Sequence, residues 1–158
     1  MATIRVVTDI AATPATCFDL ARSVEAHIKS TAGTGERAVG GVTTGLLGPG
    51  DEVTWRARHF GITQELTSRI MAYDRPRHFR DVMVRGPFRQ FEHDHHFGAV
   101  PAGTRMVDVC DFTAPLGFVG TLAERIVLTR YLTRFLQRRA AVLKHLAESD
   151  GGRRFGAG

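Results

Sequence analysis

The chain has 158 residues, of which 43% are hydrophobic and 23% charged, and its formal net charge is +5. This length fits a single domain, and the balance of apolar to charged residues excludes an intrinsically disordered chain. No run of about 18 apolar residues occurs, so we expect no membrane span. The N-terminal residues lack the charged and apolar regions of a secretory signal. Two cysteines, Cys17 and Cys110, are too few for a disulfide framework and lack zinc-binding spacing, which predicts a cytoplasmic protein.

The basic residues are spread along the chain. The 21 lysines and arginines concentrate only between Arg125 and Lys144 and in Gly151-Gly152-Arg153-Arg154. No helix-turn-helix, zinc-finger or RNA-recognition pattern accompanies them. We therefore expect a solvated basic face and no nucleic-acid partner.

The first 35 residues predict a strand followed by two short helices. Ile4 to Ile10 is rich in β-branched residues, which is typical of a strand. Thr13-Pro14 provides an N-cap and a proline at the first helical position, and Ser23 can cap a second helix that runs to about Ser30. The glycines of Thr31 to Gly35 end that helix.

A period of two dominates the middle of the chain. Val53, Trp55, Ala57 and His59 alternate with more polar residues, and similar segments follow with turns such as Gly86-Pro87 and Pro101-Ala102-Gly103 between them. We expect about six antiparallel strands in a meander after the two short helices. The segments with the clearest pattern are Val53–Phe60, Gln64–Ile70, Arg80–Val84, Phe88–Phe97 and Thr104–Phe112.

One long helix is predicted at the end of the chain. Apolar residues recur at steps of three and four from Leu128 to Leu146. A helix from about residue 118 to 147 would be roughly 45 Å long, which requires a curved sheet to cover it. Such a sheet, closed at its mouth by the two short helices, leaves an internal cavity; a packed core without a cavity is the alternative.

The order of elements and several motifs resemble the START and birch-pollen-allergen (SRPBCC) superfamily, in its polyketide cyclase/dehydrase-like branch. The motifs are those of residues 53–61, 86–95 and 103–108, together with Pro115-Leu116-Gly117. The resemblance covers about residues 3 to 147. It implies an α+β helix-grip fold, in which a curved antiparallel sheet wraps around a long C-terminal helix, with two short helices after the first strand. We expect one ligand-binding domain over residues 1–149 and a flexible Gly/Arg tail over residues 150–158.

Four polar residues fall on the face of the strands that we assign to the interior. His59 shares its face with Trp55, His93 and His95 lie two residues apart on another strand, and Asp108 lies on a third. These residues support three interpretations, which the sequence leaves open. They can act as acid–base groups, since histidine titrates near neutrality. His59, His93 and His95 can bind zinc or another transition metal. They can also form a hydrogen-bonded polar lining.

Other residues are candidates for contact with a ligand. Arg139 falls within the apolar stripe of the last helix; it can bind a carboxylate or enolate, pair with an acid such as Asp108, or extend its head to water. His27 lies where the cavity mouth is expected, either as a gate or as a surface residue. Asp94 and His96 are expected to face solvent. The remaining expected ligand contacts are Trp55, Phe91, Met106, Cys110, Phe112 and Phe135.

The sequence therefore predicts a protein that binds a small hydrophobic, aromatic or polyketide-like molecule in an internal cavity. The enzymatic version is a cyclase or dehydratase that uses His59, His93, His95 and Asp108. The alternatives are a non-catalytic carrier or sensor and a metal-binding cavity protein. No phosphate-binding glycine fingerprint occurs, so a nucleotide cofactor is not expected. The identity of the ligand and the choice between monomer and homodimer stay open.

Overall fold

One curved antiparallel sheet forms a face of the molecule in the computed structural model, which describes residues 1–114 and 122–149. The described residues form seven strands in the spatial order β1-β7-β6-β5-β4-β3-β2. Apart from the β1–β7 contact, every pair of neighbours is consecutive in the chain, as the meander predicts. The strands are β1 (Ala2–Ile10), β2 (Arg37–Gly41), β3 (Glu52–His59), β4 (Ile62–Asp74), β5 (His78–Arg85), β6 (Gln90–Val100) and β7 (Gly103–Thr113).

Two short helices follow β1 at the positions that the caps predict. In α1 (Pro14–Ala21), the hydroxyl of Thr13 accepts a hydrogen bond from the amide of Thr16. In α2 (Val24–Ser30), the hydroxyl of Ser23 accepts one from the amide of Ala26. A short 3₁₀ turn, η1 (Ala32–Thr34), then leads to the edge of the sheet.

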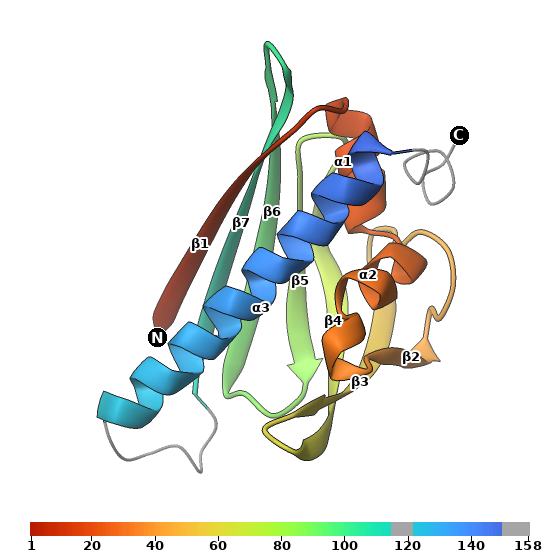
Figure 1. The fold of residues 1–158 in the computed structure, drawn as a ribbon. Helices are drawn as coiled ribbons and strands as arrows, with labels where there is room; N and C mark the ends of the chain where they lie inside the picture. The colour runs from red at the N-terminus through yellow and green to blue at the C-terminus, as the bar shows by residue number, and fades with distance from the viewer. Residues whose placement is uncertain (115–121, 150–158) are drawn as a thin grey trace.

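The long helix α3 (Leu122–Glu148) runs obliquely across one face of the sheet, with α1 and α2 beside it (Figure 1). Both short helices and β1 contact α3. Its buried stripe includes Leu128, Leu132 and Leu136, which recur every four residues. The predicted α+β helix-grip fold is therefore confirmed. None of the described helices is long and apolar enough to span a bilayer.

Parts of the predicted organisation fall outside the described residues. These are the Pro115-Leu116-Gly117 motif, the expected first turn of the last helix from about residue 118, and the tail over residues 150–158. Within the described part, α3 is helical from Leu122 onward.

The alternation along β6 and β7 directs side chains to opposite faces of the sheet. On β7, Met106, Asp108, Cys110 and Phe112 are buried, whereas the residues between them are partly exposed. On β6, His93 and His95 are buried and His96 is exposed, as the period of two predicts. Asp94 also belongs to the outer set but is only 7% exposed, because His78 and Arg80 cover its carboxylate.

The pattern does not predict β2. This strand is short, pairs only with β3, and contains a register shift between Ala38 and Gly40. A short edge strand with two glycines and one large apolar residue carries little hydrophobic pattern for a sequence-based assignment.

Candidate functional site

An internal cavity of about 170 Å³ lies between the sheet and α3. Its walls are mostly apolar. For comparison, an engineered apolar cavity of about 150 Å³ holds benzene, so this volume suits a molecule of one or two rings. The apolar walls include Leu47, Trp55, Leu66, Ile70, Phe79, Phe88, Phe91, Leu128, Leu132, Phe135 and Leu136.

The cavity reaches the surface at the turn between β3 and β4. Phe60 lines the cavity and is also 51% exposed. Phe60 and Gly61 form a two-residue hairpin turn in which both residues have positive φ, 52° and 73°. Such turns match the twist of the flanking strands, but a non-glycine residue at positive φ is uncommon. The turn therefore holds an aromatic ring at the mouth of the cavity, where it packs against Tyr131.

Four polar residues form a network at one end of the cavity, and we name Asp81, His93, His95 and Asp108 the inner cluster. His93, His95 and Asp108 are buried, and the side chain of Asp81 is 22% exposed. His95 lies between two carboxylates: Nδ1 is 2.8 Å from Oδ1 of Asp108, and Nε2 is 2.9 Å from Oδ2 of Asp81. The rings of His93 and His95 lie 3.9 Å apart between centroids. Phe79 stacks on the His95 ring at 4.3 Å. This packing fixes the orientation of His95.

The pKa values of the residues of the inner cluster are shifted in different directions. Burial lowers the pKa of His95, but its hydrogen bonds to Asp108 and Asp81 outweigh that effect and raise the pKa above the ordinary histidine value. Burial alone would raise the pKa of both carboxyls, but the neighbouring imidazoles hold it below the usual range. The pKa of His93 is lowered by burial and by the charge of His95. The directions of these shifts favour an imidazolium between two carboxylates, beside a neutral imidazole.

Only two members of the inner cluster line the cavity, namely Asp81 and His93. His95 and Asp108 lie behind them and are 1% and 3% exposed. The sequence placed His93, His95 and Asp108 on the interior face of their strands, and the structure brings the three together. Asp81 was missed, although it lies two residues after the buried Phe79 on the same face of β5.

The structure does not bring His59 into the inner cluster. His59 lies at the end of β3, three strands away from β6 in the sheet order. Its Nδ1 is 2.6 Å from the hydroxyl oxygen of Tyr131, and burial lowers its pKa. Glu36 faces the same part of the cavity, and its carboxylate is 3.0 Å from Nε2 of His27. His59, Tyr131, Glu36 and His27 thus form a second polar region of the lining.

Because His59 lies apart from the inner cluster, the three expected metal ligands, His59, His93 and His95, do not come together. In the described part of the chain, the interior donors whose ligand atoms lie within 4.8 Å of one another are Asp81, His93 and His95. Asp81 therefore takes the place expected for His59. Both ring nitrogens of His95 are within hydrogen-bonding distance of carboxylates, so the group as it stands is a hydrogen-bond network.

Arg139 enters the cavity from α3 with few partners. It is 6% exposed, and its Nη2 donates a long hydrogen bond of 3.4 Å to the carbonyl of Ala21. Among residues 1–114 and 122–149, no carboxylate lies within ion-pair distance of its guanidinium. An ion pair with Asp108, one of the alternatives for Arg139, is not formed; Oδ1 of Asp108 lies 2.8 Å from Nδ1 of His95 instead.

Two buried side-chain nitrogens of the described residues have no hydrogen-bond partner, and both belong to residues that line this cavity. They are Nε2 of His93 and Nε of Arg139. Nε2 of His93 lies 3.2 Å from Oδ1 of Asp108 but is not aligned for a hydrogen bond. Since buried polar groups are almost always hydrogen-bonded, two unpartnered buried atoms in residues that line the same cavity need an explanation.

The apolar residues expected to contact a ligand fall into two sets. Trp55, Phe91, Cys110 and Phe135 line the cavity. Trp55 also stacks on the His27 ring, with centroids 3.9 Å apart, so His27 is part of the lining. Burial raises the pKa of the Cys110 thiol, which therefore packs as a small apolar group.

Met106 and Phe112 do not line the cavity and are buried in the core. Both lie on β7, next to β1, and β1 packs directly against α3. The space between the sheet and the helix is filled at these two positions. The lining from the sheet comes mostly from β3 to β6, and β7 contributes Cys110.

A long helix held against a curved sheet, with a largely apolar cavity between them, defines a helix-grip protein with an internal binding site. A family model described as polyketide cyclase / dehydrase and lipid transport matches residues 1–148, and the chain belongs to this family. No curated protein matches the chain.

Solved structures with the same fold come from several organisms. The Zhui aromatase/cyclase from Streptomyces sp. R1128 superimposes with a TM-score of 0.77 at 15% identity, covering 99% of each chain. A protein from Thermus thermophilus gives 0.75 at 18% identity, covering 91% of this chain and 95% of that one. A START superfamily protein from Mycobacterium smegmatis gives 0.69 at 12% identity, with 92% and 97% covered. At these identities the likeness shows the fold.

Proposed function

We propose that the protein binds a small molecule with an aromatic or apolar body and one carbonyl or carboxylate oxygen, and that it catalyses proton transfer next to that oxygen. The observation that carries this proposal is a pair of buried, unpartnered nitrogens, His93 Nε2 and Arg139 Nε, in two residues that line one largely apolar cavity. A ligand oxygen that accepts from Arg139 would supply the missing partner. The aromatic walls, including Trp55 and Phe135, suit the apolar body.

The inner cluster suits acid–base chemistry of the cyclase or dehydratase type. A neutral His93 can take a proton from the carbon beside a ligand carbonyl, while the guanidinium of Arg139 stabilises the resulting enolate oxygen. In a β-hydroxy ketone, the carbon–oxygen bond to the hydroxyl then breaks. The hydroxyl leaves as water with the proton returned by His93, and a conjugated double bond forms. This sequence balances without a cofactor.

In this proposal, His95 positions His93 and does not itself contact the ligand. His95 cannot donate to the ligand, because both of its nitrogens face carboxylates. Its ring lies against that of His93, and its charge adds to burial in lowering the pKa of His93. His59 and Tyr131 lie in the other polar region of the cavity and can bind a second ligand oxygen.

Binding can be tested with naphthoate, an aromatic carboxylate of suitable size, by quenching of the fluorescence of Trp55. Trp55 is the only tryptophan and lines the cavity. Loss of a hydrogen bond to a charged group costs about 1.5–3 kcal/mol, so Arg139→Met should weaken naphthoate binding by about 10- to 100-fold. The matched control is Arg138→Met, because Arg138 is the neighbouring arginine on α3 and is exposed. Equal affinities of the two variants would contradict the role of Arg139.

The chemistry can be tested with the aldol adduct of benzaldehyde and acetone, which loses water to give benzylideneacetone. His93→Phe keeps the ring contact with His95 and should lower turnover by about 10²- to 10⁴-fold while naphthoate binding persists. His96→Phe is the control, since His96 lies on the same strand but on its outer face. Turnover retained in His93→Phe would contradict the catalytic proposal, and binding without turnover in the unmodified protein would favour the carrier alternative.

A further inference from the structure

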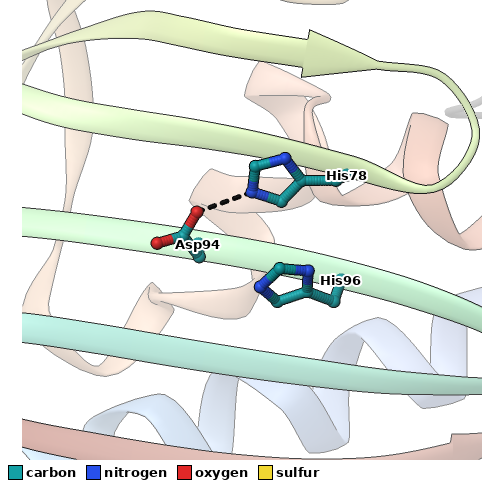
Figure 2. A group of neighbouring side chains, drawn as sticks. All are labelled: His78, Asp94 and His96. Carbon is teal, nitrogen blue, oxygen red and sulfur yellow. Dashed lines mark hydrogen bonds and ion pairs between the residues drawn. The ribbon is translucent and has the colours of Figure 1, made fainter.

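A second cluster of histidine and aspartate lies on the outer face of the sheet, on the same two strands as part of the inner cluster. Figure 2 shows His78 of β5 beside Asp94 and His96 of β6, and we name these three residues the outer cluster. Neither the cavity nor the proposed function uses them. His78 is paired directly with His96 across the two strands, and Arg80 with Asp94.

The register places the donor atoms of the outer cluster close together. Nε2 of His78 is 2.6 Å from Oδ1 of Asp94. The rings of His78 and His96 stack with centroids 4.6 Å apart at an interplanar angle of 18°. One ligand atom from each of the three residues lies within 4.8 Å of the other two. Zinc binds nitrogen and oxygen at about 2.0–2.2 Å, so its ligand atoms lie roughly 3–3.5 Å apart in a tetrahedral site. Side-chain rotations that bring the three ligand atoms from within 4.8 Å to this spacing would complete the geometry.

We propose that His78, Asp94 and His96 form a surface site for a divalent transition metal of the zinc type. Two imidazoles and one carboxylate are ligands that such metals accept, and water can occupy the fourth position. His96 is exposed and the side chain of His78 is 26% exposed, so the ion can enter from solvent.

Arg80 is the charged neighbour that this site must accommodate. Its Nε lies 2.9 Å and 3.0 Å from the two carboxylate oxygens of Asp94, and its Nη2 lies 2.8 Å from Oδ2. Hydrogen bonds of this kind orient a ligating carboxylate from behind. The metal would replace the contact between His78 and Oδ1, while Arg80 retains Oδ2. The side chain of Arg80 is 43% exposed, so water screens its repulsion of the ion.

The inner cluster does not compete well for the same ion. Its Asp81, His93 and His95 are also close enough to serve as donors, but His95 is held between two carboxylates and is 1% exposed. A metal there would have to displace the hydrogen bonds of His95 to Asp108 and Asp81 and lose its water. At the outer cluster, it displaces only the contact between His78 and Asp94 at the surface.

The experiment is a titration of the untagged full chain with Zn²⁺ by isothermal calorimetry, and with Co²⁺ by absorption. We expect one equivalent to bind. His78→Asn and His96→Asn should each weaken binding by at least about 10-fold. The controls are His145→Asn, which removes an exposed histidine of α3, and His93→Asn, which removes a donor of the inner cluster. Both controls should retain the equivalent.

A second readout is the melting temperature. An ion that binds only the folded chain should raise it by about 5–10 °C when free zinc is about 100 times Kd. His78→Asn should abolish this rise. The proposal is overturned if the unmodified chain binds no stoichiometric metal, or if binding persists in the two outer variants and is lost in His93→Asn. Neither result bears on naphthoate binding or turnover in the cavity.

Discussion

Strands β5 and β6 carry histidines and aspartates on both faces, and the two sets behave differently. On the inner face, His95 lies between Asp81 and Asp108 and is almost fully buried. On the outer face, His78 and Arg80 share Asp94, while His96 is exposed. The residue types are the same and successive residues of one strand supply them. Which side of the sheet a residue faces therefore decides what chemistry it can do.

The difference has an electrostatic cause. Charges in a protein interior interact more strongly than at its surface, but bringing them out of water costs several kcal/mol for each ion. The inner cluster offsets that cost with hydrogen bonds at both nitrogens of His95. The histidines of the outer cluster are accessible to water, so its ion pairs are weaker and its donors can change partners. The inner set is thus built to hold one protonation state, and the outer set to exchange ligands.

The largest effect is expected from removing the charge of Asp108. Asp108→Asn leaves the His95 imidazolium with one carboxylate in a buried site, and breaking a buried ion pair costs about 3–5 kcal/mol. The matched variant on the outer face, Asp94→Asn, should cost about 1 kcal/mol, because its partners Arg80 and His78 reach water. Urea unfolding of the two variants measures both values. Equal losses would contradict the distinction between the faces.

A smaller change in the free energy of unfolding is expected when the pH is varied, because His95 titrates. Its pKa is raised in the folded protein, so its stabilisation is complete below the ordinary histidine pKa of about 6.5 and is lost as the pH rises through the raised value. The free energy of unfolding should therefore fall above about pH 6.5. The loss is about 1.4 kcal/mol for every pH unit between the ordinary and the raised pKa. Asp81 and Asp108 are ionised throughout this range and do not contribute to the slope.

The lowered pKa of His93 has the opposite effect on the free energy of unfolding. At acidic pH the unfolded chain binds a proton that the folded protein does not, so stability rises with pH. The comparison is therefore best made between His93→Phe and His93→Phe/His95→Gln, by urea unfolding from about pH 6.5 to 9. The single variant should lose stability across this range more steeply than the double variant. Parallel pH profiles would show that His95 is not held as an imidazolium.

The fold could be predicted from the sequence because its signals are local and repeated. The caps at Thr13 and Ser23 each mark the start of one helix, and the period of two marks the strands. The apolar stripe of α3 requires a sheet curved around it. The edge strand β2 could not be predicted, since Arg37–Gly41 has almost no apolar pattern.

The site was predictable only where neighbouring strands carry it. His93, His95 and Asp108 lie on β6 and β7, which pair directly, so the alternation alone brings them together. His59 also faces inward, but which inward residues meet depends on the strand order and on the curvature of the sheet. The role of Asp81 depends on the pairing of Asp81 with His93, a register that the sequence does not specify.

The smallest effect is expected for Arg80→Gln, and its salt dependence tests the comparison most directly. Arg80 pairs with Asp94 at the surface, so its loss should cost about 1 kcal/mol or less. Because the side chain of Arg80 is 43% exposed and the Debye length falls to about 3 Å at 1 M salt, salt should reduce this difference between the variant and the unmodified protein. The loss caused by Asp108→Asn should change much less with salt, because Asp108 and His95 are 3% and 1% exposed. Urea unfolding of both variants at about 0.05 M and 1 M sodium chloride measures this contrast. A salt-independent loss for Arg80→Gln would mean that the outer cluster is as isolated from solvent as the inner one, and its capacity to exchange a proton for a metal would then be lost as well.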